Sequence, residues 1–155
     1  MDIREQLQRD TVSDVGYRKL VAVAHTATVA DAVRTMQSQE VGCCLVVEDD
    51  ELVGIFTERN LVVRVLHAGL PLSTPITECM TLDPEVVQAK APIRALFTCL
   101  QRGGFRHAPV VDDDGHAVGT TSVKRAVRFL GANLPEVVQN VPPEPGRYPD
   151  RPEGG

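Results

Sequence analysis

Apolar positions along the chain follow two alternating patterns. Between residues 29 and 36 they recur at the three- and four-residue spacing of an amphipathic helix, and the same spacing returns between residues 93 and 100. Each of these segments is followed by two short apolar runs on either side of an acidic turn, at 44–53 and 109–120. Short runs of this kind predict pairs of strands joined as hairpins.

Residues with a known preference for helix ends border these segments. Thr28 and Asp31 have the spacing of a capping box at the start of the first helix. Gly42 is expected to end that helix, and the Gly103-Gly104 pair is expected to end the helix that begins near residue 93. Residues that favour helix ends therefore mark where each of these helices should stop before the next strand.

The whole arrangement occurs twice, at a spacing of 64–65 residues. Val29 corresponds to Ile93, and the block around Leu45 corresponds to the block around Pro109. A second helix is expected after each hairpin, at 61–66 and at 123–130. Each repeat is therefore a small β-α-β-β-α unit with one bare sheet face. We expect an α/β (α+β) fold in which the two units pack sheet to sheet with pseudo-twofold symmetry.

The repeat divides the chain into five parts. Residues 1–9 form an N-terminal segment, 10–66 the first repeat and 67–78 a proline-containing connector. The second repeat is expected at 79–130. Residues 131–155 hold six of the eleven prolines, so we interpret them as a Pro-rich tail that is partly disordered.

Composition narrows the class of protein. The 155 residues are 43% hydrophobic and 24% charged, with a formal net charge of −5. This acidic balance disfavours a general nucleic-acid binder, which needs a basic face. The chain start has no apolar signal core and no stretch approaches the roughly 18 apolar residues of a membrane span, so a cytoplasmic protein is expected.

Catalytic and metal-binding patterns are weak. The four cysteines, Cys43, Cys44, Cys79 and Cys99, show no metal-ligand spacing and are expected to be buried, reduced thiols. The acidic run at 112–114 resembles a calcium loop only in composition and is expected to be a hairpin turn. No nucleophile or general base can be assigned, so we expect neither an enzyme nor a metal protein.

One short motif occurs in both repeats at the same period. It reads Gly54-Ile55-Phe56-Thr57-Glu58-Arg59-Asn60 in the first copy and Gly119-Thr120-Thr121-Ser122-Val123-Lys124-Arg125 in the second. Together with the order of helices and hairpins, it resembles the glycine–apolar–x–Thr/Ser–x–x–Asp/Asn signature of a tandem pair of cystathionine-β-synthase (CBS) domains, also called a Bateman module. The resemblance covers about residues 10–130 and departs from the pattern at Arg125.

The motif places polar groups at the start of a helix. Thr57 occupies the N-cap position, where a hydroxyl can donate to a phosphate, and Asn60 follows one turn later. The resemblance implies that Asn60 binds the ribose of an adenine nucleotide and that Val21, Val41 and Gly42 lie beside the adenine. The alternative is that Thr57 is only a helix cap and Asn60 a solvated residue.

The second copy is altered in its chemistry. Ser122 keeps the hydroxyl, but Arg125 stands where the resemblance implies a ribose-binding acid, and arginine has no hydrogen-bond acceptor. Lys124 and Arg128 lie nearby on the same helix. Arg106 lies where the chain enters the strand that follows the helix at 93–100. Three interpretations stay open: an empty site, a site that takes polyphosphate or the phosphates of a ligand in the first site, and a merely solvated basic face.

The resemblance implies a stand-alone regulatory module without catalysis. Its ligand would be AMP, ADP, ATP or S-adenosylmethionine, with Mg²⁺ accompanying ATP. Ligand binding would act on a homodimer or on an unknown effector protein. The helix faces expected to supply the dimer contact contain Ile93, Leu96, Phe97 and Leu100 with Leu61, Val62 and Val65. The alternative is a dimeric interaction scaffold that binds no nucleotide; nucleic acid and membrane are not expected partners.

Overall fold

The computed structural model describes residues 2–104 and 106–133. The first half contains these elements: α1 (Ile3–Arg9), α2 (Val12–Val15), β1 (Arg18–Lys19), β2 (Ala22–Ala24), α3 (Val29–Gln39), β3 (Cys43–Glu48), β4 (Glu51–Thr57), α4 (Glu58–Asn60) and the π-helix η1 (Leu61–Leu66). The second half contains these: the 3₁₀ turn η2 (Ile76–Glu78), β5 (Thr81–Leu82), β6 (Val87–Gln88), α5 (Ile93–Gly103), β7 (His107–Val111), β8 (Ala117–Ser122) and α6 (Val123–Ala132). The expected order of helices and hairpins is confirmed in both repeats.

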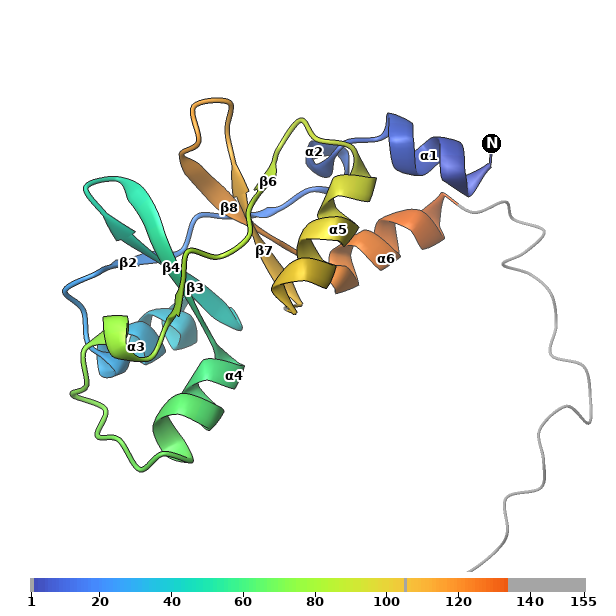
Figure 1. Ribbon diagram of the computed structural model, residues 1–155. Helices are drawn as coiled ribbons and strands as arrows, with labels where there is room; N and C mark the ends of the chain where they lie inside the picture. Colours follow the sequence, from blue (N-terminus) through green and yellow to red (C-terminus); the bar gives the residue numbers. More distant parts are fainter. Residues whose placement is uncertain (1, 105, 134–155) are drawn as a thin grey trace, which may run out of the picture.

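The described strands form two four-stranded sheets, with orders β2-β3-β4-β5 and β1-β8-β7-β6. Each sheet takes one edge strand from the other repeat. Arg18 and Lys19 of β1 pair antiparallel with Thr120 and Gly119 of β8. In the same way β5 pairs with β4. The chain from α1 to β2, blue in Figure 1, therefore runs from the second repeat across to the first. Because of this exchange, we expect the two repeats to fold together.

Helix caps explain where the main helices begin. Thr28 accepts a hydrogen bond from the backbone N–H of Asp31, and the Asp31 carboxylate accepts from the N–H of Thr28, so the predicted capping box is confirmed. The end of α3 differs from the expectation that Gly42 terminates it. The helix stops at Gln39, because Glu40 adopts a left-handed conformation with φ 53°. Gly104 ends α5 in the expected left-handed conformation.

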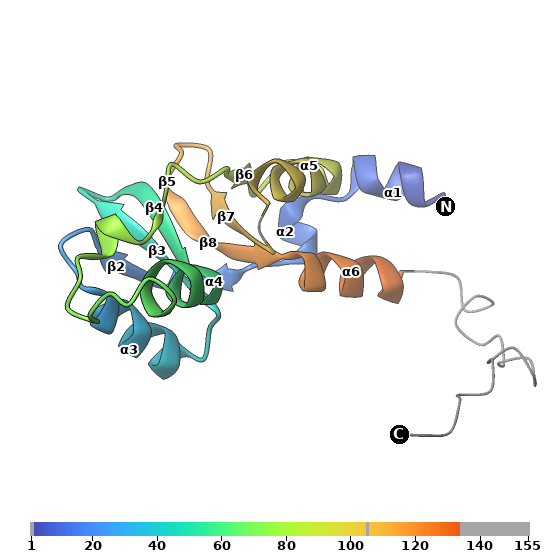
Figure 2. The same ribbon diagram turned by 60° about the horizontal axis from the view of Figure 1, so that its bottom comes forward.

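Each repeat has its own apolar core on the helix-covered face of its sheet. Figure 2 shows α3 and α4 on the first sheet and α5 and α6 on the second. Val12 and Val15 of the N-terminal helix α2 belong to the second core, together with Ile93 and Leu96. A third cluster, formed by Cys43, Leu45 and Ile55 with Ala117 of β8 packed against it, joins the two sheets. The predicted sheet-to-sheet packing is therefore present.

The predicted dimer contact has to be corrected. Ile93, Leu96 and Val65 are fully buried and Leu100 is nearly so, because these side chains fill the cores of their own repeats. They cannot supply an outer apolar face. Of the residues named for this contact, Val62 is exposed; the other exposed apolar residues are Val63 and Leu66 on η1 and Val123 and Val127 on α6.

Two further expectations concern the chain as a whole. No helix within residues 2–104 and 106–133 is long and apolar enough to cross a membrane. The Pro-rich tail was predicted at 131–155; α6 extends to Ala132, and residues 134–155 lie outside the described part of the chain.

Buried thiols should make the fold sensitive to alkali. Cys43 and Cys44 are free, and they point to opposite sides of β3, into the inter-sheet cluster and the first core. Burial raises the pKa of Cys43 to about 11 and that of Cys44 to about 12. The folded state thus favours the neutral thiol, so its contribution to stability is present below pH 9 and is lost as pH rises toward 11–12.

We expect the free energy of unfolding, measured by urea titration under reducing conditions, to fall between pH 9 and 11. In Cys44→Ala one of these thiols is gone, so the fall should be smaller although the starting stability is lower. A slope unchanged by Cys44→Ala would contradict this assignment.

Candidate functional site

Two clefts open where the repeats meet, and each is lined by residues from both. The first cleft, with a volume of about 350 Å³, contains Thr57, Glu58 and Arg59 of the first motif and Gly104, Arg106 and His107 of the second repeat. The second cleft, about 310 Å³, contains Ser122, Lys124 and Arg125 of the second motif and residues 40–43 of the first repeat. Gly42 and His107 line both clefts.

The clefts are related by the internal symmetry of the fold. The N–H of Glu58 donates to the carbonyl of Gly42 at 3.1 Å, and the N–H of Val123 donates to the carbonyl of Arg106 at 3.1 Å. These bonds join equivalent positions, since each connects the first helical residue of a motif to the segment that enters the neighbouring strand. The same backbone scaffold therefore carries different side chains in the two clefts.

Thr57 and Asn60 are bonded to each other rather than pointing together into the first cleft. The Asn60 Oδ1 accepts from the Thr57 N–H at 2.9 Å and from its hydroxyl at 3.1 Å, while the Thr57 Oγ1 accepts from the Asn60 N–H at 3.2 Å. Asn60 Nδ2 donates to Thr81 Oγ1 of β5 at 3.4 Å. Thr57 lines the first cleft, whereas Asn60 is only 5% exposed and does not line it.

The three residues predicted to lie beside the adenine, Val21, Val41 and Gly42, do not all line the same cleft. Val41 and Gly42 line the second cleft, and Gly42 also lines the first. Both residues also border a cavity of about 420 Å³ that includes Val33 of α3 and Leu61 of η1. Val21 is half-buried against the first core, and its carbonyl accepts from the N–H of Leu45, so it lines neither cleft.

The predicted residues of the second repeat all reach a cleft. Arg106 lines the first cleft, and Ser122 and Arg125 line the second. Ser122 caps α6 by accepting from the N–H of Arg125 at 3.2 Å. Among the described helices, α2, α3 and α4 complete this arrangement with a capping box, but Arg125 has no acceptor with which to complete it in α6.

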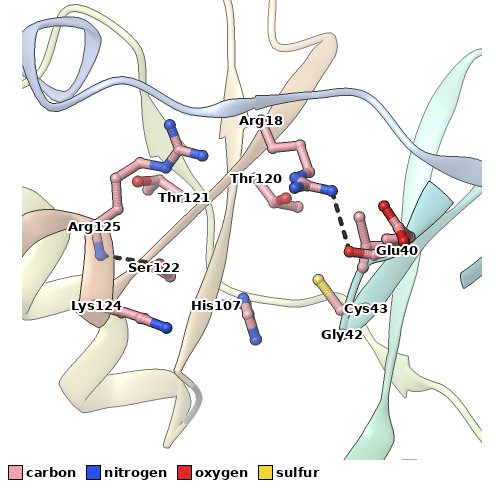
Figure 3. Close-up of a pocket in the computed structure, with 11 residues that line it drawn as sticks. Arg18, Glu40, Gly42, Cys43, His107, Thr120, Thr121, Ser122, Lys124 and Arg125 are labelled. Carbon is pink, nitrogen blue, oxygen red and sulfur yellow. Dashed lines mark hydrogen bonds between the residues drawn. The ribbon is translucent and has the colours of Figure 1, made fainter.

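Some lining residues were not anticipated from the sequence. Arg18 enters the second cleft from β1 and donates to the carbonyls of Gln39 and Glu40, at 3.1 and 3.3 Å, at the end of α3 (Figure 3). No periodic pattern marks a two-residue strand, so Arg18 could not be predicted to lie at a cleft. Glu58 of the first motif, for which the spacing predicts no role, lines the first cleft.

His107 lines both clefts, and its surroundings shift its pKa. Burial lowers its pKa, the carboxylate of Glu58 opposes that shift, and the guanidinium of Arg106 adds to the lowering. A neutral imidazole can both donate and accept, so it can serve a ligand in either cleft.

Comparison with known proteins decides the family. The protein-family model for the CBS domain matches residues 12–67 of this chain and again residues 76–132. The chain belongs to the CBS-domain family. It contains two CBS domains in tandem, as its internal repeat and signature motifs indicated.

Relatives of this CBS pair differ in length. The CBS domain-containing protein CBSCBSPB1 of Arabidopsis thaliana is 31% identical over 124 residues, which is 78% of this chain but only 23% of the Arabidopsis protein. An uncharacterized 17.7 kDa protein of Acidianus ambivalens is 27% identical over 120 residues, covering 77% of this chain and 72% of that protein.

Solved structures share the fold. A CBS domain protein from Pyrobaculum aerophilum complexed with AMP has a TM-score of 0.70 at 21% identity, covering 79% of this chain and 99% of that one. CBSX2 in complex with AMP has a TM-score of 0.62 at 25% identity, covering 76% of this chain and 93% of that one. The two-sheet CBS-pair architecture derived above is therefore shared with these proteins.

Proposed function

We propose that this CBS pair is a regulatory module that binds an adenine nucleotide in the first cleft. The observation that carries the proposal is the position of Thr57, which lines a cleft built from both repeats. Arg59 and Arg106 line the same cleft and are suited to the negative charge of a phosphate. The complex of CBSX2 with AMP, at 25% identity, supports adenine nucleotide as the ligand class.

Nucleotide binding would compete with the helix cap. For Asn60 to reach a ribose, its side-chain oxygen has to leave the Thr57 N–H and hydroxyl that it bonds in this structure. Releasing these bonds loosens the junction between β4 and α4 and the contact of Asn60 with Thr81 in the exchanged strand β5. A ligand that favours the released state would shift the population toward it and so change the surface seen by a partner.

The module would act on other copies or on an effector protein. A homodimer contact would keep Val62 of the faces first considered and would replace their buried residues by the other exposed apolar residues of η1 and α6. The signal would then pass from the cap to η1, because η1 follows α4 without a break. The ligand could be AMP, ADP, ATP or S-adenosylmethionine, with Mg²⁺ accompanying ATP.

A scaffold that binds no nucleotide is the second candidate. The observation in its favour is the closed Thr57–Asn60 capping box, which uses both motif side chains within the protein. Thr57 would then act as a cap and nothing more. The two candidates differ in what ligands do to the stability of the protein.

A thermal-melt panel with AMP, ADP, ATP, S-adenosylmethionine, NAD and GTP, with and without Mg²⁺, tests the proposal. A ligand at about 100 times its Kd should stabilise the fold by about 2.7 kcal/mol, a shift of several degrees. We expect one adenosyl ligand to give this shift in the wild-type protein and to lose most of it in Thr57→Val.

Thr28→Val is the matched control, because Thr28 forms the same capping box with Asp31 but lines neither cleft. Both variants should lower the melting temperature of the free protein, since each loses a cap worth about 1 kcal/mol. Only Thr57→Val should also lose the ligand shift. No shift with any ligand up to millimolar concentration would favour the scaffold instead.

A further inference from the structure

The second cleft gathers positive charge that the described part of the protein does not neutralise. Arg18, Lys124 and Arg125 line it, against one carboxylate, that of Glu40. Neither Lys124 nor Arg125 takes part in any ion pair between residues of the described ranges. An adjoining cavity of about 510 Å³, which shares Ser122, Lys124 and Arg125, adds Arg128.

These cations stand where local stability disfavours them. Lys124 and Arg125 lie in the first turn of α6, at the positive end of the helix dipole, where acidic residues stabilise a helix. Arg125 also occupies the position at which Asp14, Asp31 and Asn60 complete capping boxes in other helices. Residues that oppose a local stability preference, such as cations at a helix start, without a compensating ion pair tend to belong to functional sites.

The hydrogen-bonding character of the cleft selects among ligands. Arginine and lysine only donate, and the Ser122 Oγ, which accepts from the Arg125 N–H, keeps its own hydrogen for a ligand. Linked phosphates offer many acceptors and a high negative charge. A ribose, in contrast, needs acceptors for its hydroxyl hydrogens, and Arg125 provides none where the motif of the first repeat has Asn60.

We propose that the second cleft binds linked phosphates, at least two phosphoryl groups in a chain, and does not hold a nucleoside. Arg18 is fixed to the end of α3 in the first repeat, whereas Lys124 and Arg125 belong to α6 of the second. Figure 3 shows these side chains on either side of the same cleft. An anion that contacts both groups therefore bridges the two repeats.

Two sources can supply such a chain of phosphates: a free polyphosphate, or the phosphate tail of a nucleotide seated in the first cleft. The second source is sterically reasonable because Gly42 and His107 line both clefts. The proposal concerns the shared chemistry, and it does not depend on nucleotide binding in the first cleft.

Calorimetric titration of the full chain with sodium tripolyphosphate tests the proposal. We expect one binding event per chain, weakened roughly tenfold to a hundredfold in Arg125→Gln and in Lys124→Gln, since each loses a charge-assisted hydrogen bond. Both residues are exposed, so the variants should fold, as their melting temperatures would show. Arg94→Gln is the control: it removes an exposed cation of α5 that lines neither cleft.

The two sources give different results in the same experiment. If tripolyphosphate binds with unchanged affinity when AMP is saturating, the second cleft takes a free polyphosphate. If ATP binds more tightly than AMP, and Arg125→Gln removes that advantage, the cleft receives the tail of the nucleotide. Either result supports the proposal.

Other results would overturn the proposal. These are the absence at millimolar concentration of both tripolyphosphate binding and an ATP advantage that depends on Arg125, an equal loss in Arg94→Gln and Arg125→Gln, and a loss in Thr57→Val without one in Arg125→Gln. The proposal and the proposed function fail separately. If tripolyphosphate binds but no adenosyl ligand does, only the proposed function is refuted. If AMP binds and Thr57→Val abolishes its binding, while tripolyphosphate does not bind and ATP binds no more tightly than AMP, only the phosphate proposal is refuted.

Discussion

Replacing Gly119 by valine is expected to lower the free energy of unfolding by about 3 kcal/mol. A Cβ atom at this position would overlap the carbonyl oxygen of Arg18 and come within 2.7 Å of the Tyr17 ring. The carbonyl belongs to the backbone of β1, which pairs with β8 at this residue, so it cannot move without breaking that pairing. Urea unfolding of wild-type and variant proteins measures the loss.

Gly54, the equivalent glycine of the first repeat, gives a graded comparison. A Cβ there would overlap the side chain of Met80 and lie 3.0 Å from the carbonyl oxygen of Thr81. Because the methionine side chain is flexible, Gly54→Ala should cost less than Gly119→Ala. Gly131→Ala is the control, since a Cβ there meets no heavy atom within 4 Å. Wild-type stability in Gly119→Val would mean that β1 does not pair with β8.

These glycines show what the sequence could and could not reveal. The motif identified Gly54 and Gly119 as equivalent, and the repeat, the hairpins and the Thr28 cap were all predictable from periodicity and capping chemistry. The reason for the glycines was not predictable. It lies in β1 and β5, two-residue strands that cross from the other repeat and are too short to show any period.

For the candidate site, the sequence predicted backbone positions but not all of the side-chain contacts. Thr57, Arg106, Ser122 and Arg125 line clefts because their backbone positions follow from the motif and the hairpins. Asn60 was assigned from its position one turn after Thr57, and its actual contacts depend on a choice of side-chain rotamer that spacing does not fix. The same limit applies to exposure: helical periodicity identified apolar faces but not which of them the protein's own core covers.

Replacing Phe56 by alanine is expected to lower the free energy of unfolding by about 3–5 kcal/mol, the range for a large aromatic residue removed from a core. Phe56 is fully buried in the first core and lies directly before Thr57. Its counterpart in the second repeat, Thr121, instead donates to the carbonyl of Gly16 at 3.0 Å. Phe56→Leu, which retains most of the apolar volume, should lose considerably less.

This variant also tests whether the repeats unfold as one unit. Tyr17 packs against the second core, so in a Tyr148→Phe background its fluorescence reports on the core to which Phe56 does not belong. Because β1 and β5 are exchanged, the first repeat cannot unfold without taking an edge strand from the second sheet. Phe56→Ala should therefore shift the Tyr17 transition and the far-UV circular dichroism transition together. A Tyr17 transition that stays at its wild-type urea concentration would show that the exchanged strands do not couple the repeats.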